Sequence, residues 1–105
     1  MEIWATPYFH RRILELLTDD EYGDLQDFLI AQPDAGALIP RGRGLRKLPW
    51  YAGKKAKGKR GGLRVIYYYR VRQVLFFITV YEKNKKEDLS AEELRELVKL
   101  VQEIK

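Results

Sequence analysis

Apolar residues recur at helical spacing in the first third of the chain. A short stretch, "EIWA" at residues 2–5, predicts a strand, and the spacing that follows predicts an amphipathic helix over about 7–17. Thr6 can cap this helix, and Pro7 suits its first turn because the missing N–H would be unpaired there. The chain is therefore expected to begin with a strand followed by a helix.

Two capping-box sequences predict two further helices. "TDDE" at 18–21 starts a helix that should end near Gln32, before Pro33, and "SAEE" at 90–93 starts one that should run to about Ile104. Apolar residues recur every three or four positions in both segments, which gives each helix one buried face. The first two helices of the chain are expected to form a hairpin.

Between the helices the pattern changes to that of β-strands. "LRKLPWYA" (45–52), "LRVIYYYRV" (63–71) and "VLFFITVYE" (74–82) are rich in β-branched and aromatic residues, and the last two predict a hairpin. Pro49 moves the first of these strands toward a sheet edge, because proline cannot donate to a ladder. Residues 33–44 are rich in Pro and Gly and predict a loop.

The order strand–helix–helix–strand–strand–strand–helix predicts an α+β fold. We expect a small antiparallel β-sheet with an N-terminal helical hairpin and a C-terminal helix. The 105 residues suffice for one domain with a single modest core, so residues 1–105 are expected to form one domain. The sequence contains no internal repeat and no low-complexity tail.

Composition argues against several kinds of chemistry. The chain has no cysteine, which excludes disulfides and thiolate metal sites, and one histidine, His10, is too few for a histidine metal cluster. We therefore expect no metal and no cofactor. No apolar stretch approaches the roughly 18 residues of a membrane span, and no secretory signal precedes the first strand. A cytoplasmic protein that contacts no membrane is expected.

Positive charge is concentrated in the middle of the chain. Between Ala35 and Tyr81 there are twelve Lys or Arg and no Asp or Glu, although the net charge of the whole chain is only +5. Seven of these cations lie in "GKKAKGKRGGLRVIYYYR" (53–70). A stretch of one sign repels itself and is typical of proteins that bind nucleic acids; a solvated basic surface is the plainer alternative.

Strand alternation predicts which side chains gather beside this basic stretch. Arg64 and Tyr68 share one face of their strand. In the next strand one predicted face consists of Leu75, Phe77, Thr79 and Tyr81, continued by Lys83. If the hairpin register allows, Arg64, Tyr81 and Lys83 converge on a cationic groove with an aromatic floor, which suits single-stranded RNA.

The same residue types are sufficient to cleave RNA without a metal. In that reaction the ribose 2′-OH attacks its own phosphodiester, a base takes its proton, and donors stabilise the charge on phosphorus. With no well-placed histidine, the base would be a Lys whose pKa neighbouring cations lower, or a Tyr, while Arg binds two phosphoryl oxygens. A protein that only binds RNA would use the same residues.

Three sequence blocks in a fixed order resemble a known family. "GLRKLPW", "GKRGGLRVIYYY" and "TVYEKNKKEDLSAEE" together resemble a HigB-type toxin of the RelE/ParE superfamily. The front of the chain, "LLTDDEYGDLQDFLIAQPDAGALIP", is similar to the same group, so the resemblance covers nearly all 105 residues. It implies a small α+β toxin of a bacterial type II toxin–antitoxin pair, a ribosome-dependent endoribonuclease that cleaves messenger RNA and inhibits translation. The implied partners are a cognate antitoxin, often of helix-turn-helix type, and the ribosome with its messenger and ribosomal RNA.

The resemblance also implies roles by position. Arg64 follows the glycines of "GGLR", where RelE-like toxins carry an arginine, and Lys83 in "VYEKN" matches a basic residue after the last strand. The expected catalytic residues are Arg64, Lys57, Lys59, Lys83 and Tyr81. The expected RNA-binding residues are Lys54, Lys55, Arg60, Tyr68, Arg46 and Lys47. Leu89 lies in the neighbourhood where the RelE branch often has a tyrosine, which leaves Tyr81, Tyr68 or a lysine for proton transfer.

Two other functions stay open at the level of sequence. ParE-like members of the same superfamily poison DNA gyrase as binding proteins, although such a protein would not need the basic stretch and "GGLR". A non-catalytic RNA-binding module would use the groove for binding alone. Growth arrest with DNA damage signalling would favour the first of these, and harmless overexpression would favour the second.

Overall fold

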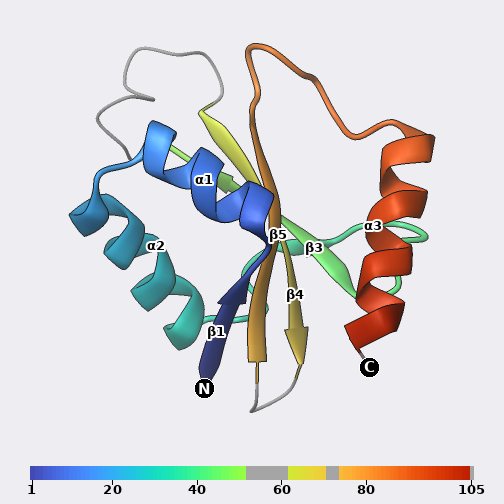
Figure 1. Cartoon of the computed structure of the whole chain (residues 1–105), viewed down its shortest axis with the longest axis horizontal. Coiled ribbons are helices and arrows are strands. Elements are labelled where there is room, and N and C mark those ends of the chain that lie inside the picture. Colours follow the sequence, from blue (N-terminus) through green and yellow to red (C-terminus); the bar gives the residue numbers. More distant parts are fainter. Residues whose placement is uncertain (52–61, 71–73, 105) are drawn as a thin grey trace.

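The computed structural model describes residues 1–51, 62–70 and 74–104. Its elements are, in chain order, β1 (Glu2–Ala5), α1 (Pro7–Leu16), α2 (Asp19–Ala31), β2 (Ala37–Leu38), β3 (Leu45–Trp50), β4 (Leu63–Arg70), β5 (Val74–Glu82) and α3 (Ala91–Ile104). The strands form one sheet, with α1 and α2 on one face and α3 on the other (Figure 1). The α+β fold class expected from the sequence is confirmed.

Local capping explains where the helices begin. The hydroxyl of Thr6 accepts a hydrogen bond from the backbone N–H three residues later, at 3.0 Å. Thr18 with Glu21, and Ser90 with Glu93, each form both hydrogen bonds of a capping box. The predicted starts of all three described helices are therefore confirmed. Within the described ranges, none of the helices is long and apolar enough to cross a membrane.

The sheet is mixed, which corrects the expected antiparallel sheet. Its strand order is β1-β5-β4-β3-β2, and β1 runs parallel to β5 while the other neighbours are antiparallel. A long chain separates β1 from β5, so no tight turn dictates their relative direction. A second correction is the two-residue strand β2, which lies inside the predicted loop and pairs with Arg46 and Lys47 of β3. Pro49 lies beyond this short pairing, toward the sheet edge as expected.

The sheet separates two hydrophobic cores, where the sequence predicted one. Buried residues of the first core, under the helical hairpin, include Phe9, Ile13, Leu25, Leu29 and Tyr67. Buried residues of the second core, under α3, are Leu45, Ile66, Ile78, Tyr81 and Val101. Because both faces of the central strands are covered, these strands are nearly continuously apolar.

One extra residue in β5 changes which face its later side chains take. Ile66 pairs with Thr79 and Tyr67 pairs with Phe77, which leaves Ile78 without a partner in β4. Such a β-bulge reverses the alternation of the strand beyond it. The common face expected in β5 is therefore wrong. Leu75 and Phe77 face the first core, whereas Thr79 and Tyr81, beyond the bulge, lie on the opposite face.

Candidate functional site

Arg64 and Tyr81 lie opposite each other in the β4–β5 ladder, on the face of the sheet that α3 covers. The bulge at Ile78 produces this pairing, since an unbroken ladder would put Tyr81 on the other face. The Arg64 side chain donates to the carbonyl of Leu63 at 3.2 Å, and its guanidinium carbon lies 5.8 Å from the ring centre of Tyr51. The expected convergence of Arg64 and Tyr81 is confirmed.

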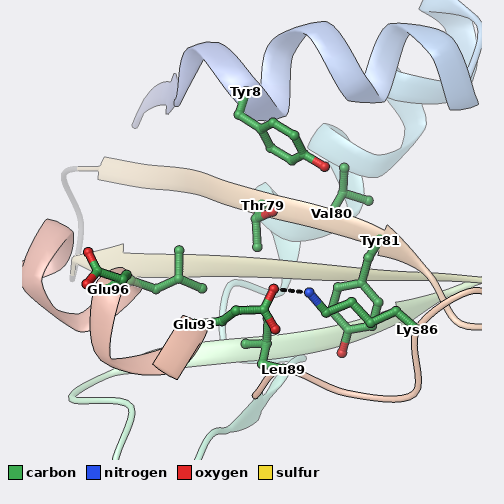
Figure 2. A pocket seen from close by; sticks show the side chains of 9 residues that line it. Tyr8, Thr79, Val80, Tyr81, Lys86, Leu89, Glu93 and Glu96 are labelled. Atoms are coloured by element: carbon green, nitrogen blue, oxygen red, sulfur yellow. Dashed lines mark hydrogen bonds and ion pairs between the residues drawn. The ribbon is translucent and has the colours of Figure 1, made fainter. Parts of the chain in front are cut away.

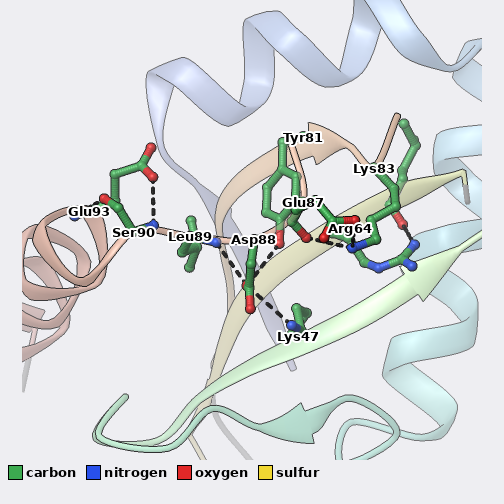
Figure 3. Close-up of polar contacts among 10 residues, drawn as sticks. Lys47, Arg64, Tyr81, Lys83, Glu87, Asp88, Leu89, Ser90 and Glu93 are labelled. Carbon is green, nitrogen blue, oxygen red and sulfur yellow. Dashed lines mark hydrogen bonds and ion pairs between the residues drawn. The ribbon is translucent and has the colours of Figure 1, made fainter. Parts of the chain in front are cut away.

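Lys83 is held beside this pair by the glycine that precedes β4. Its backbone N–H donates to the carbonyl of Gly62 at 3.0 Å. Gly62 has a φ of 61°, and an added Cβ would lie 2.6 Å from the carbonyl oxygen of Trp50, so no other residue fits without strain. The Lys83 ammonium donates to the carbonyl of Glu87 at 2.7 Å and to its Oε1 at 3.3 Å (Figure 3).

Asp88 links β3 to β5 through a single carboxylate oxygen. Its Oδ1 accepts hydrogen bonds from Lys47 Nζ at 3.3 Å, from the Tyr81 hydroxyl at 3.4 Å and from the backbone N–H of Leu89 at 2.8 Å (Figure 3). Lys47 and Arg64 lie on the same face of the sheet, because Lys47 pairs with Ile66, two positions along β4. The loop between β5 and α3 is thereby tied to the sheet beside Arg64.

Sequence reasoning missed the two acids of this loop. These acids are Glu87 and Asp88, and the structure brings them against Lys83, Lys47 and Tyr81. The available signal concerned Glu87 alone, since it follows Lys83 by four residues. In a tight loop that spacing lets a carboxylate turn back toward the lysine.

The surroundings fix the protonation of Tyr81 and Asp88. Burial raises the pKa of Tyr81 to about 12, assisted by the negative charge of Asp88 and opposed by the positive charge of Arg64. The backbone N–H of Leu89 holds the pKa of Asp88 below its usual range, and Lys47 and Tyr81 act in the same direction. At neutral pH, Tyr81 is therefore a hydrogen-bond donor and Asp88 an ionised acceptor.

Tyr81 also lines a pocket of about 430 Å³ between α1 and α3. Figure 2 shows Tyr8 from α1 above Thr79 of β5, with Glu93 of α3 below them. Lys86 forms an ion pair with Glu93, and its Nζ lies 5.7 Å from the ring centre of Tyr81. Tyr81 therefore belongs both to this pocket and to the pair that it forms with Arg64, so the pocket lies next to the candidate site.

Two expected RNA-binding residues lie away from this cluster. Arg46 shares the opposite face of the sheet, and its guanidinium donates to the carbonyl of Gly36 at 2.7 Å, near β2. Tyr68 shares the face of Arg64 but lies four residues further along β4, packed against the second core and close to Gly44. Their expected roles in binding RNA stay predictions.

The remaining expected residues lie outside the described part of the chain. They are Lys54, Lys55, Lys57, Lys59 and Arg60, all within 52–61. The described residues that flank this segment are Tyr51, whose ring lies beside Arg64, and Gly62, which holds Lys83. Both described residues that flank the basic segment therefore lie at the candidate site.

The described side chains offer charge stabilisation and proton transfer. Arg64, Lys47 and Lys83 supply three cations, and Tyr81 supplies the hydroxyl of a largely buried side chain. Within residues 1–51, 62–70 and 74–104, no group of three or more His, Cys, Asp or Glu is arranged to hold a metal ion.

The second half of the chain matches the model of one protein family. The family is described as the RelE toxin of the RelE/RelB toxin–antitoxin system, and the match covers residues 51–105. This is just over half of the chain. The matched region contains β4, β5 and α3, and hence Arg64, Tyr81, Lys83 and Asp88.

Proposed function

This chain belongs to the RelE toxin family, and we propose that it is a HigB-type toxin that cleaves messenger RNA on the ribosome and so stops translation. The observation that carries the proposal is the pairing of Arg64 with Tyr81, with Lys47 and Lys83 beside it. Family membership implies an antitoxin partner. A helix-turn-helix antitoxin and action in the bacterial cytoplasm are further parts of the proposal.

The proposed reaction is attack of a ribose 2′-OH on the adjacent phosphodiester. The O2′–P bond forms, the P–O5′ bond breaks, a base takes the 2′ proton, and the leaving O5′ receives a proton. Arg64 stabilises the charge that builds on the phosphoryl oxygens, because its planar fork donates two parallel hydrogen bonds. Lys83 and Lys47 contribute positive charge at the edge of the same site.

Tyr81 suits the role of the proton donor to the leaving oxygen. With a pKa of about 12 it keeps its proton throughout the neutral range, which makes it a poor general base. We assign the base, or substrate binding next to it, to Lys57 or Lys59 of the segment 52–61. Lys54, Lys55 and Arg60 of the same segment would hold the RNA backbone by charge.

Asp88 acts in this scheme as a positioning residue. It holds the Tyr81 hydroxyl and the Lys47 ammonium on one oxygen, on the α3 side of Arg64. An RNA phosphate that enters the site would compete with Asp88 and Glu87 for the two lysines, since phosphate and carboxylate oxygens accept the same donors.

Primer extension on a defined message in a reconstituted translation system tests the proposal. Wild type is compared with Arg64→Ala and with Arg70→Ala, a matched control at the exposed far end of the same strand. Wild type and Arg70→Ala should cut at codon-periodic positions, Arg64→Ala should not, and a reaction without ribosomes should leave the message intact.

Each alternative outcome contradicts the proposal in its own way. Cleavage without ribosomes would make the chain a free ribonuclease. An intact message with wild type would reject the nuclease, and gyrase inhibition would then be tested next. Equal cleavage by wild type and Arg64→Ala would remove Arg64 from the reaction.

A further inference from the structure

A groove of about 720 Å³ lies between α3 and the loop that joins β2 to β3. Figure 1 shows this loop running alongside α3. The residues that line the groove are Pro40, Arg41, Ala91, Leu94, Arg95, Val98 and Lys99. The five residues from α3 recur every three or four positions, so one continuous face of the helix forms a wall of the groove.

The groove combines an apolar floor with a cationic rim. Pro40, Leu94 and Val98 supply apolar surface, whereas Arg41 and Arg95 supply charge. Across the described part of the chain, neither arginine has an acidic partner within 4.0 Å. The lining contains no acid, although α3 itself carries several. These two cations are thus available to a negatively charged partner.

The loop holds its arginine in a fixed and costly conformation. Arg41 has a φ of 65°, in the left-handed region that disfavours residues with a Cβ. The turn is closed by hydrogen bonds from Gly42 N–H to the carbonyl of Ile39 at 2.8 Å and from Ile39 N–H to the carbonyl of Leu45 at 2.9 Å. A loop backbone fixed before binding loses less entropy when a partner arrives.

We infer that this groove binds an amphipathic helical segment of the antitoxin, with apolar residues three and four positions apart and Asp or Glu beside them. Apolar side chains of such a helix would fill the floor, and its acids would pair with Arg41 and Arg95. RNA fits less well, because phosphates gain from the rim but nothing from Leu94 and Val98. The inference rests on family membership and not on the proposed nuclease activity.

The groove is separate from the Arg64 site but adjoins its loop. Ala91 lines the groove at the start of α3, three residues after Asp88. Arg64, Tyr81 and Lys83 do not line it. An antitoxin segment bound there would leave the cations of the candidate site uncovered by that segment.

A single labelled cysteine tests occupancy directly, since the chain contains no cysteine of its own. Gln102→Cys is exposed one turn beyond Val98 on the same face of α3, and Ala31→Cys is an exposed control at the end of α2. With an environment-sensitive dye attached, titration with the purified antitoxin of the same pair should change the signal saturably at 102 and not at 31. A change at neither position would overturn the inference.

Charge reversal tests the chemistry of the occupant. The double variant Arg41→Glu, Arg95→Glu should weaken antitoxin binding at least tenfold in calorimetry, because attraction at the rim becomes repulsion. Arg11→Glu, an exposed arginine of α1, is the single-charge control and should leave binding unchanged. Circular dichroism should show all variants folded.

Two results would overturn the inference even with folded protein. One is unchanged antitoxin affinity in the double variant while ribosome pelleting is also unchanged, which would leave the groove without either role. The other is unchanged antitoxin affinity together with weaker pelleting on ribosomes, which would identify the groove as a docking surface for ribosomal RNA. Because calorimetry with antitoxin involves no RNA, a failed nuclease assay would leave a positive binding result intact.

Discussion

Tyr81 stands opposite Arg64 because β5 contains one residue more than its partner strand at Ile78. On the side of the bulge nearer the β4–β5 turn, Tyr67 pairs with Phe77. The same register continued without a bulge would bring Val80 opposite Arg64. Tyr81 would then face the helical hairpin. The bulge thus determines that the Tyr81 hydroxyl and the Arg64 guanidinium share the face where Lys83 and Asp88 also lie.

Replacement of Arg64 by lysine should abolish most of the activity although it keeps the charge. A lysine offers one rotatable ammonium in place of two parallel donors, so stabilisation of the phosphoryl oxygens is lost. We expect single-turnover cleavage to fall about a hundredfold. Arg70→Lys on the same strand should cleave like wild type. Comparable rates for Arg64→Lys and wild type would mean that only the charge matters.

Asp88→Asn should lower the pKa of Tyr81. Burial is the largest cause of its elevation to about 12 and persists in the variant, whereas the charge and hydrogen bond of Asp88 are lost or weakened. The pKa should therefore move only part of the way toward 10. Ultraviolet titration of tyrosinate measures it, with Tyr81→Phe in each background identifying the signal of this residue. An unchanged pKa of Tyr81 in the variant would mean that Asp88 does not contribute to its elevation.

Stability should fall between pH 10 and pH 12, in part because of Tyr81. Its folded pKa of about 12 exceeds the usual 10.0, so in that range the unfolded chain loses a proton that the folded chain keeps. The contribution of Tyr81 to the free energy of unfolding is fully present below pH 10. It declines as the pH rises toward 12, by up to roughly 3 kcal/mol. Denaturant unfolding from pH 9 to 11 should show a smaller decline for Tyr81→Phe. Parallel curves would contradict the assignment.

Gly62→Ala should destabilise the fold, whereas Gly23→Ala should not. At Gly62 the φ is 61° and a Cβ would lie 2.6 Å from the carbonyl oxygen of Trp50, so the cost should be about 2 kcal/mol or more. Gly23 lies in α2 with nothing within 4 Å of its added Cβ, and alanine there should stabilise by roughly 0.5–1 kcal/mol. Urea midpoints measure both changes. A tolerated Gly62→Ala would show that the turn can relax.

Much of the fold could be predicted from neighbouring residues alone. The helix starts follow from Thr6, Thr18 and Ser90, whose hydroxyls accept from backbone N–H groups only three positions away. The two faces of β4 follow from strict alternation, which put Arg64 and Tyr67 on opposite sides of the sheet. Such signals are local, so a sequence carries them without knowledge of the rest of the chain.

The candidate site depended on contacts between distant residues, and its prediction was correspondingly partial. Arg64, Tyr81 and Lys83 were identified from pattern and resemblance, but Asp88 was missed because its partner Lys47 is forty-one residues away in the chain. Arg46 was grouped with Lys47 by sequence, yet adjacent strand residues point to opposite faces and only Lys47 reaches the site.

The sequence by itself determined the elements, the basic stretch and the face that carries Arg64, because capping, periodicity and charge are properties of short segments. Only the tertiary structure decided the parallel pairing of β1 with β5, the bulge at Ile78 and the joining of Lys47 to Tyr81 through Asp88. These features depend on register and on packing between separate elements. Local propensity does not encode them, since each depends on which residues far apart in the chain come into contact.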